Sequence, residues 1–250
     1  MDKEFAGLSV IVTGAASGLG RSVAVELSQR GADLALVDVN EGGLEETEAL
    51  CAENGSKTIV IPTDLSDPDA CLRPVAKTVE KFGRLDSLCN VAGMLVFGHA
   101  AETSVEQYDK LYAVNVRAPF LLFQQAFPHL EKTAGSVVNV ASASGLTGHS
   151  YIAAYSSTKG ALIALTRSLA VEYWKTPVRI NAVAPGGMLT PMATGTTVTE
   201  DYDPQLLFIG SGPREIAQPE DVAQVVAFLA SPRAKRVHGS VYSMDQGVTA

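Results

Sequence analysis

The stretch LSVIVTGAASGLG at residues 8–20 decides the fold, because an apolar run leads directly into a glycine-rich turn. A helical pattern follows around residues 18–30. In this setting Gly14 permits a tight turn, Gly18 lets the backbone approach a ligand, and Gly20 lets the helix pack closely against the strand. The free N–H groups at the start of a helix favour an anion. Together, the strand, turn and helix predict a site for a pyrophosphate group.

The same alternation of apolar β-type runs and helix-type segments continues along the whole chain. Further apolar runs lie at residues 33–38, 58–63, 85–93, 135–142, 178–185 and 239–245. Helical candidates lie at residues 43–53, 68–82, 103–131, 152–174 and 219–230. Near-continuous apolar runs are typical of strands covered on both faces, and repeated β–α units indicate a parallel sheet. We expect an α/β fold with a single Rossmann-like doubly wound domain over residues 1–250, in which helices flank both faces of a seven-stranded parallel sheet.

Two segments break this regular pattern. Residues 103–131 are too long for one ordinary helix, and Pro119 and Pro128 interrupt them, so we expect a break or kink. Glycines and prolines punctuate residues 190–214, among them Gly195, Gly210, Gly212 and Pro213. Because a loop that long in a compact domain is usually functional, we expect a substrate lid at about residues 188–213.

The composition is that of a globular, acidic protein. The 250 residues are 46% hydrophobic and 18% charged, and 19 Lys and Arg against 27 Asp and Glu give a formal charge of −8. This balance argues against a nucleic-acid or anionic-membrane partner, since both require a basic face. Residues 133–158 and 180–199 lack charged side chains, but their many Gly, Ser, Thr and Pro residues exclude a membrane helix.

Cysteine and histidine usage points away from disulfides and metals. Three cysteines are too few and too odd in number for a disulfide framework, and the four histidines show no ligand spacing, so we expect no metal site. Reduced thiols fit a cytoplasmic protein. The charged start MDKEFAG lacks the apolar core of a signal peptide, and we expect a cytoplasmic location.

An acidic residue stands where a dinucleotide site would use one. Asp38 ends the second strand, eighteen residues after Gly20. A carboxylate there can bind the hydroxyls of an adenosine ribose and repels a 2′-phosphate. The glycine-rich turn also contains no Lys or Arg. These features favour NAD (NAD+/NADH) over NADP, and the alternative is that Asp38 only caps the turn before Asn40.

Tyr155 and Lys159, in the segment YSSTK, lie four residues apart and share one face of a helix. A tyrosine with its ordinary pKa of about 10 is a poor base at neutral pH. A nearby ammonium group lowers that pKa, and an oxidised nicotinamide would lower it further. Taken alone, the pair is more typical of a solvated helix surface, where such pairs are common.

These motifs together resemble the short-chain dehydrogenase/reductase family in its one-domain form of about 250 residues. The resemblance covers essentially the whole chain. Its motifs, in order, are Thr13–Gly20, Asn90-Val-Ala-Gly93, Asn115, Ser142, Tyr155–Lys159, and Pro185-Gly186 with Thr190. Departures from the family pattern are Val91 for the usual second Asn, Ala141 for the usual first Ser, and Gln246 for the usual Gly.

The resemblance implies reversible hydride transfer between a nicotinamide ring and a carbinol or carbonyl carbon. It implies Tyr155 as the general acid/base, Ser142 as the group that holds the substrate oxygen, and Lys159 as the group that holds the nicotinamide ribose. Asn115 would position a water in a proton relay. The implied cofactor contacts are Gly14, Ser17, Gly18, Leu19, Gly20, Asp38, Asp64, Leu65, Asn90, Ala92, Gly93, Val114, Tyr155, Lys159, Pro185, Gly186, Met188 and Thr190.

By the same resemblance the substrate lies over the nicotinamide, lined by residues 94–99, 143–151 and 186–210. These segments contain no Lys or Arg, so a neutral, moderately apolar secondary alcohol or ketone fits better than an anionic substrate. The candidate substrate contacts are Ser144, His149 and Met192. Ser144 is also a rival to Ser142, and a lone loop histidine such as His149 is more often a surface residue.

Two alternative functions remain open on the sequence alone. A 3-oxoacyl-[acyl-carrier-protein] reductase would need NADPH and a basic docking patch. Asp38 and the charge of −8 oppose it, although Arg117, His129 and Lys132 could form a local patch. A non-catalytic NAD-binding sensor would not need the set Asn115, Ser142, Tyr155 and Lys159.

The family is usually homotetrameric, and we expect a homotetramer here. Residues 111–130 and 152–171 are apolar on more than one face, so each could cover the core and a neighbouring subunit. Full burial within the monomer would produce the same pattern.

Overall fold

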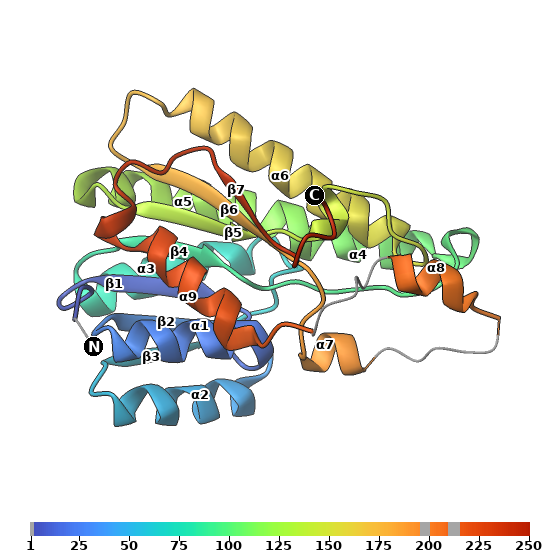
Figure 1. Cartoon of the computed structure of the whole chain (residues 1–250). Helices are drawn as coiled ribbons and strands as arrows, with labels where there is room; N and C mark the ends of the chain where they lie inside the picture. The colour runs from blue at the N-terminus through green and yellow to red at the C-terminus, as the bar shows by residue number, and fades with distance from the viewer. Residues whose placement is uncertain (1–2, 196–200, 210–215) are drawn as a thin grey trace.

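One parallel sheet organises the computed structural model, which describes residues 3–195, 201–209 and 216–250 (Figure 1). Its strands are β1 (Ser9–Thr13), β2 (Asp33–Asp38), β3 (Thr58–Pro62), β4 (Ser87–Asn90), β5 (Ser136–Val140), β6 (Arg179–Pro185) and β7 (Val241–Met244). They lie in the order β3-β2-β1-β4-β5-β6-β7, and every neighbouring pair is parallel. The predicted seven-stranded parallel sheet is confirmed. The strand order reverses between β1 and β4, which opens a crevice at the carboxyl ends of these strands.

Helices cover both faces of the sheet, as predicted (Figure 1). They are α1 (Gly18–Gln29), α2 (Glu41–Glu53), α3 (Arg73–Phe82), α4 (Val105–Tyr112), α5 (Ala118–Thr133), α6 (Ala153–Glu172), α7 (Pro191–Thr194), α8 (Pro204–Ile209) and α9 (Pro219–Ala230). In β1, Val10 and Val12 pack with α1 and α9, whereas Ile11 faces α3 and α5. Both sides of the strand are therefore buried, which explains its continuous apolar run.

The helical segment at residues 103–131 is interrupted once, just before Pro119, and not at Pro128. A π-helical turn at Ala113–Arg117 separates α4 from α5. Pro119 lies in the first turn of α5, where its missing N–H is not needed. Helix α5 continues through Pro128 to Thr133, so the break predicted at Pro128 is wrong. Because α5 buries Leu122, Ala126 and Leu130 against the sheet, packing maintains the helix around the proline.

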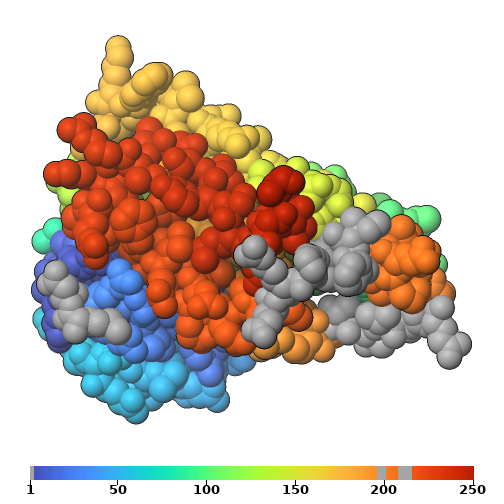
Figure 2. Space-filling model, in the orientation of Figure 1, coloured from blue at the N-terminus to red at the C-terminus, as the bar shows by residue number. Residues whose placement is uncertain are grey.

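The segment expected to be a loop and substrate lid contains two short helices, α7 and α8. Residues 196–200 and 210–215, including Gly210, Gly212 and Pro213, lie outside the described residues. Residues 201–209 form the orange surface at one end of the molecule in Figure 2. None of the helices in the described ranges is long and apolar enough to cross a membrane.

Candidate active site

A cleft of three connected cavities opens where the strands end at their carboxyl sides. The central cavity, with about 740 Å³ of empty space, lies between the glycine-rich turn and the ends of β4, β5 and β6. A second cavity shares Gly14 and Gly93 with it and extends to Asp64. A third shares Ser142 and Tyr155 with it and extends to His149. We name the two outer ones the Asp64 cavity and the His149 cavity.

The cleft brings together nearly all the residues predicted from the sequence. Its walls include Gly14, Ser17, Gly18, Leu19, Gly20, Asp38, Asp64, Leu65, Ala92, Gly93, Val114, Ser142, Ser144, His149, Tyr155, Lys159, Pro185, Gly186, Met188, Thr190 and Met192. Asn90 and Asn115 lie behind the walls, where both are buried. Asn90 donates a hydrogen bond from Nδ2 to Asn139 Oδ1 at 2.8 Å, which links β4 to β5.

The glycine-rich turn forms a cradle that side chains would fill. Gly14 has φ of +71°, and a Cβ there would lie 2.8 Å from the Cα of Ala92. A Cβ on Gly20 would lie 1.9 Å from the carbonyl oxygen of Gly14. Thr13 Oγ1 accepts hydrogen bonds from the N–H groups of Val91 and Ala92, both at 3.0 Å, which ties the turn to the end of β4. The first turn of α1 begins at this cradle, so the residues present fit the pyrophosphate of a dinucleotide.

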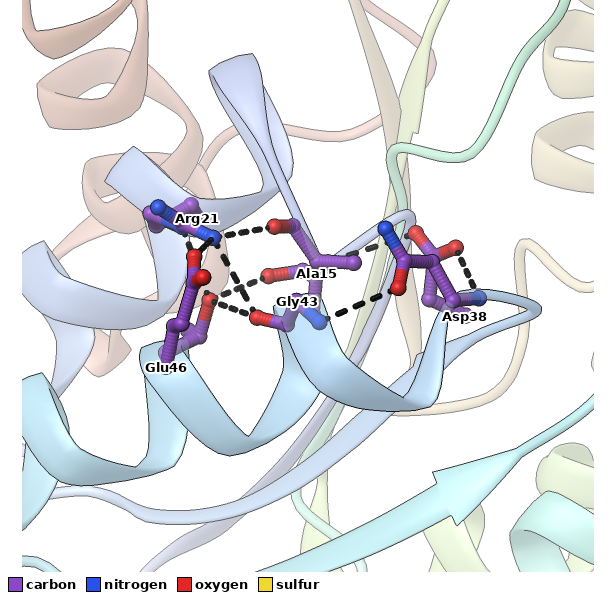
Figure 3. A network of polar contacts seen from close by, with 8 residues as sticks. Ala15, Arg21, Asp38, Gly43 and Glu46 are labelled. Atoms are coloured by element: carbon purple, nitrogen blue, oxygen red, sulfur yellow. Dashed lines mark hydrogen bonds and ion pairs between the residues drawn. The ribbon is translucent and has the colours of Figure 1, made fainter.

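Asp38 has two roles in the structure. Its carboxylate accepts hydrogen bonds from the N–H groups of Ala16 at 3.2 Å and Asn40 at 3.0 Å (Figure 3). It also lines both the central cavity and the Asp64 cavity. Asp38 therefore does cap the turn before Asn40, and this cap leaves room for contact with a ligand, since one carboxylate can accept several hydrogen bonds.

The first basic residue after the turn, Arg21, is used to join helices. Its Nη2 donates to the carbonyl oxygen of Ala16 at 2.6 Å and pairs with Glu46 at 2.6 Å, while Nε donates to Thr47 at 3.0 Å (Figure 3). The guanidinium group thus holds α1 against α2. It does not line any of the three cavities.

Ser142, Tyr155 and Lys159 share one wall of the central cavity. Ser142 Oγ accepts hydrogen bonds from the N–H of Ser144 at 3.2 Å and from its hydroxyl at 2.9 Å. A hydroxyl that accepts two bonds still has its own proton to donate, and Ser142 and Tyr155 both line the central cavity and the His149 cavity. Of the two rival serines, Ser142 lines both the central cavity and the His149 cavity, whereas Ser144 lines the His149 cavity and donates to Ser142.

Burial controls the ionisation of Tyr155 and Lys159. It raises the pKa of the Tyr155 phenol to about 12, and the hydrogen bond from Ser142 acts in the opposite direction. It lowers the pKa of Lys159 to about 8. We expected Lys159 to lower the pKa of Tyr155, and this expectation is wrong for the protein without its cofactor, in which the pKa is raised. The ammonium donates to the carbonyl oxygen of Val140 at 2.8 Å and lies 5.6 Å from the centre of the tyrosine ring, so loss of solvation dominates.

Asn115 belongs to the π-helical turn, and its side-chain amide makes three hydrogen bonds. Its amide accepts from the N–H of Met94 at 2.9 Å and donates to the carbonyl of Met94 and to Thr158 Oγ1, both at 3.0 Å. A Cβ on Gly93 would lie 3.4 Å from Lys159 Nζ and 3.5 Å from Asn115 Oδ1. Asn115 thus fixes the loop after β4 against α6 at the point where Lys159 ends.

Sequence reasoning missed several residues of the walls. Val39 follows Asp38 directly, is 69% exposed, and lines the Asp64 cavity. The rule that ligands bind beyond the carboxyl ends of strands could have identified Val39. Lys110 also lines this cavity, but it comes from α4, and no local pattern indicates where α4 packs.

Comparisons with known proteins agree with this geometry. A family model described as enoyl-(acyl carrier protein) reductase matches residues 14–249. The structure of a short-chain dehydrogenase from Mycobacterium paratuberculosis bound to NAD matches with a TM-score of 0.91 and 28% identity, covering 98% of this chain and 99% of that one. The chain belongs to the short-chain dehydrogenase/reductase family.

Other members of the short-chain dehydrogenase/reductase family that resemble this chain are oxidoreductases or bind a nicotinamide cofactor. An uncharacterized oxidoreductase of Thermotoga maritima is 39% identical over 98% of this chain and 99% of its own length. Levodione reductase of Leifsonia aquatica is 36% identical over 96% and 94%. A Burkholderia cenocepacia member in complex with NADP has a TM-score of 0.90 and 28% identity, over 99% of this chain and 100% of that chain. The protein is thus an oxidoreductase of a family whose solved members bind NAD or NADP.

Proposed function

We propose that the protein interconverts a secondary alcohol and a ketone by hydride transfer with NAD(H), on a neutral and moderately apolar substrate. The observation that carries the proposal is the shared wall of Ser142, Tyr155 and Lys159, beside a cradle that fits a dinucleotide. When bound, the cofactor supplies the hydride donor or acceptor. The protein's own residues then have to hold the substrate oxygen and move one proton.

Tyr155 and Ser142 carry the proton chemistry in this proposal. A phenol with its pKa raised to about 12 is protonated at neutral pH, and it donates a proton to the oxygen that becomes an alkoxide during reduction. Ser142 donates a hydrogen bond to the same oxygen and stabilises its developing charge. In the oxidation direction Tyr155 takes the proton back. Lys159 holds the nicotinamide ribose in this proposal. Asn115 fixes the loop after β4 against α6, because its amide already donates hydrogen bonds to Met94 and Thr158.

The preference for NAD over NADP rests on Asp38 and its surroundings. The carboxylate repels a 2′-phosphate, and the next residue, Val39, offers no positive charge. Arg21 could bind a 2′-phosphate only by breaking its hydrogen bond to Ala16 and its ion pair with Glu46. The description of the family model keeps one alternative, a carrier-protein-dependent reductase using NADPH. That alternative needs a basic docking patch, and Arg117, one residue of the suggested patch, already donates a hydrogen bond to the carbonyl of Ser66 within the protein.

The test is NADH formation from NAD with a panel of secondary alcohols, sugars and hydroxysteroids, repeated with NADP. We expect turnover with one chemical class and NAD. The Tyr155→Phe variant should lose almost all turnover and retain NADH binding, measured by fluorescence titration. Faster turnover with NADP would refute the Asp38 reasoning, and unchanged turnover in Tyr155→Phe would refute the role of the phenol.

We also propose that the protein is a cytoplasmic homotetramer. The supporting observation is a set of exposed apolar side chains on α4, α5 and α6 and just beyond α6, which are Val105, Tyr108, Phe120, Val171 and Trp174. Such residues are commonly covered by a neighbouring subunit. A stable monomer in analytical ultracentrifugation would refute the tetramer, and cell fractionation tests the location.

A further inference from the structure

The His149 cavity is an apolar chamber with a few polar groups. Its apolar lining comes from Leu95, Ala143, Ile152, Met188, Met192 and Ala193. Its polar side chains are Ser142, Ser144, His149, Tyr155 and Thr190. No Lys, Arg, Asp or Glu is among the described residues that line it. A ligand in this chamber therefore meets uncharged hydrogen-bonding groups at a small number of points.

One of these polar groups has no partner. Ser144 donates a hydrogen bond from its hydroxyl to Ser142 Oγ at 2.9 Å, so these two side chains are partners of each other. His149 Nε2 is buried and makes no hydrogen bond, and within the described part of the chain it is the one such side-chain atom on a residue lining this cavity. A buried polar atom without a partner is unfavourable, so its presence calls for an explanation, and a ligand that supplies the missing partner is one.

The imidazole of His149 is uncharged at neutral pH, because burial lowers its pKa from the ordinary value of 6.5. A neutral imidazole has one nitrogen that donates and one that accepts. It can bind a hydroxyl or a carbonyl oxygen, and it provides no charge to attract a carboxylate or phosphate.

The loop that carries His149 is held in place from two sides. Tyr151, with φ of +62°, accepts the N–H of Gly98 on its carbonyl at 2.8 Å and the N–H of Asp203 on its hydroxyl at 2.9 Å. Its ring packs against Tyr202 with centroids 4.7 Å apart. The loop therefore does not depend on a substrate for its conformation, and the position of the imidazole is prepared in advance.

We propose that His149 is a specificity-determining residue which binds a second oxygen of the substrate, so that the site prefers uncharged alcohols or ketones with a further hydroxyl or carbonyl group. The proposal rests on the proposed function, in which Ser142 and Tyr155 hold the first oxygen. It adds a second fixed point on the lining of the same chamber. The preferred substrates are thus diols, hydroxyketones or diketones rather than simple alcohols.

The kinetic test compares cyclohexanol with the cyclohexane-1,2-, 1,3- and 1,4-diols, using NAD. We expect kcat/KM of the wild type to be about tenfold higher for at least one diol than for cyclohexanol, as one additional hydrogen bond would give. His149→Leu should remove most of that preference, and His149→Gln, which keeps a donor and an acceptor, should restore part of it. Thr147→Ala, an exposed site in the same loop, should leave the preference unchanged. An equal loss for cyclohexanol and the diols in His149→Leu would overturn the proposal.

A spectroscopic test separates this inference from the proposed function. The chain has four histidines, so the imidazole signals of His149 in an NMR spectrum can be assigned by their absence in His149→Leu. In the complex with NADH, a diol or diketone should shift these signals and cyclohexanol should not. A shift without any turnover would support the second binding point and refute the proposed reaction. Turnover without a shift would do the reverse.

Discussion

Lys159 carries a buried charge that makes the protein less stable, and removing that charge should raise stability. The side chain is 3% exposed, donates to the carbonyl of Val140, and has no carboxylate partner among the described residues. Burial lowers its pKa from 10.5 to about 8. This depression corresponds to roughly 3 kcal/mol, since a tenfold change in an equilibrium constant is worth about 1.4 kcal/mol. The lost hydrogen bond offsets about 1 kcal/mol of it.

We therefore expect Lys159→Met, which keeps an apolar stem, to unfold with a free energy about 2 kcal/mol higher than the wild type at pH 7. For a chain of this length that corresponds to a rise in Tm of about 4–8 °C. Thermal unfolding followed by circular dichroism, without cofactor, measures it. Lys77→Met, at an exposed position on α3, is the matched control and should leave the Tm nearly unchanged.

The pH dependence provides the sharper test. Between about pH 8 and 10.5 the unfolded chain keeps a proton on Lys159 that the folded protein has released, so the wild type gains stability as the pH rises. The Tm difference between Lys159→Met and the wild type should be constant below pH 8 and shrink toward pH 10. A variant less stable than the wild type at pH 7, or a difference that does not change with pH, would refute the reasoning.

Three further predictions follow from other contacts. Asp38→Ser should raise the ratio of kcat/KM for NADP over NAD at least tenfold, because it removes the charge that repels a 2′-phosphate, and steady-state kinetics with both cofactors measures this. Gly14→Ala should weaken NADH binding at least tenfold in a fluorescence titration, because its Cβ would lie 2.8 Å from Ala92 Cα at a φ of +71°. Arg179→Leu should lower the unfolding free energy by about 3 kcal/mol in urea denaturation. The buried guanidinium donates to four carbonyls at the end of α9 and just beyond, and the variant would lose all four of these charge-assisted hydrogen bonds.

The sheet could be predicted from the sequence because each strand carries its own signal. A strand buried on both faces reads as a continuous apolar run, so β1 and β2 were located to within one residue at each end. The interruption between α4 and α5 was placed less well. Pro128 is a helix breaker by local chemistry, but the packing of α5 on the sheet overrides it.

The site was predictable in its membership and not in its electrostatics. Motif spacing identified Tyr155 and Lys159, but the direction of the tyrosine pKa depends on burial, which comes from segments far apart in the chain. His149 illustrates the same limit. A lone loop histidine is expected at the surface, yet contacts of the neighbouring Tyr151 with Gly98 and Asp203 hold its loop over a cavity. No local pattern contains those contacts.

Burial links the stability of this site to its chemistry. Loss of solvation raises the pKa of Tyr155 to about 12 and so stabilises the phenol, which in the proposed function is the form that donates a proton to a developing alkoxide. The same loss of solvation brings the pKa of Lys159 to about 8, where it can exchange a proton near neutral pH. An exposed lysine would stabilise the protein but would remain protonated and strongly solvated. If the proposed function is correct, the same burial that destabilises the protein at Lys159 also permits its proton exchange, and a variant that recovers the stability should lose that exchange.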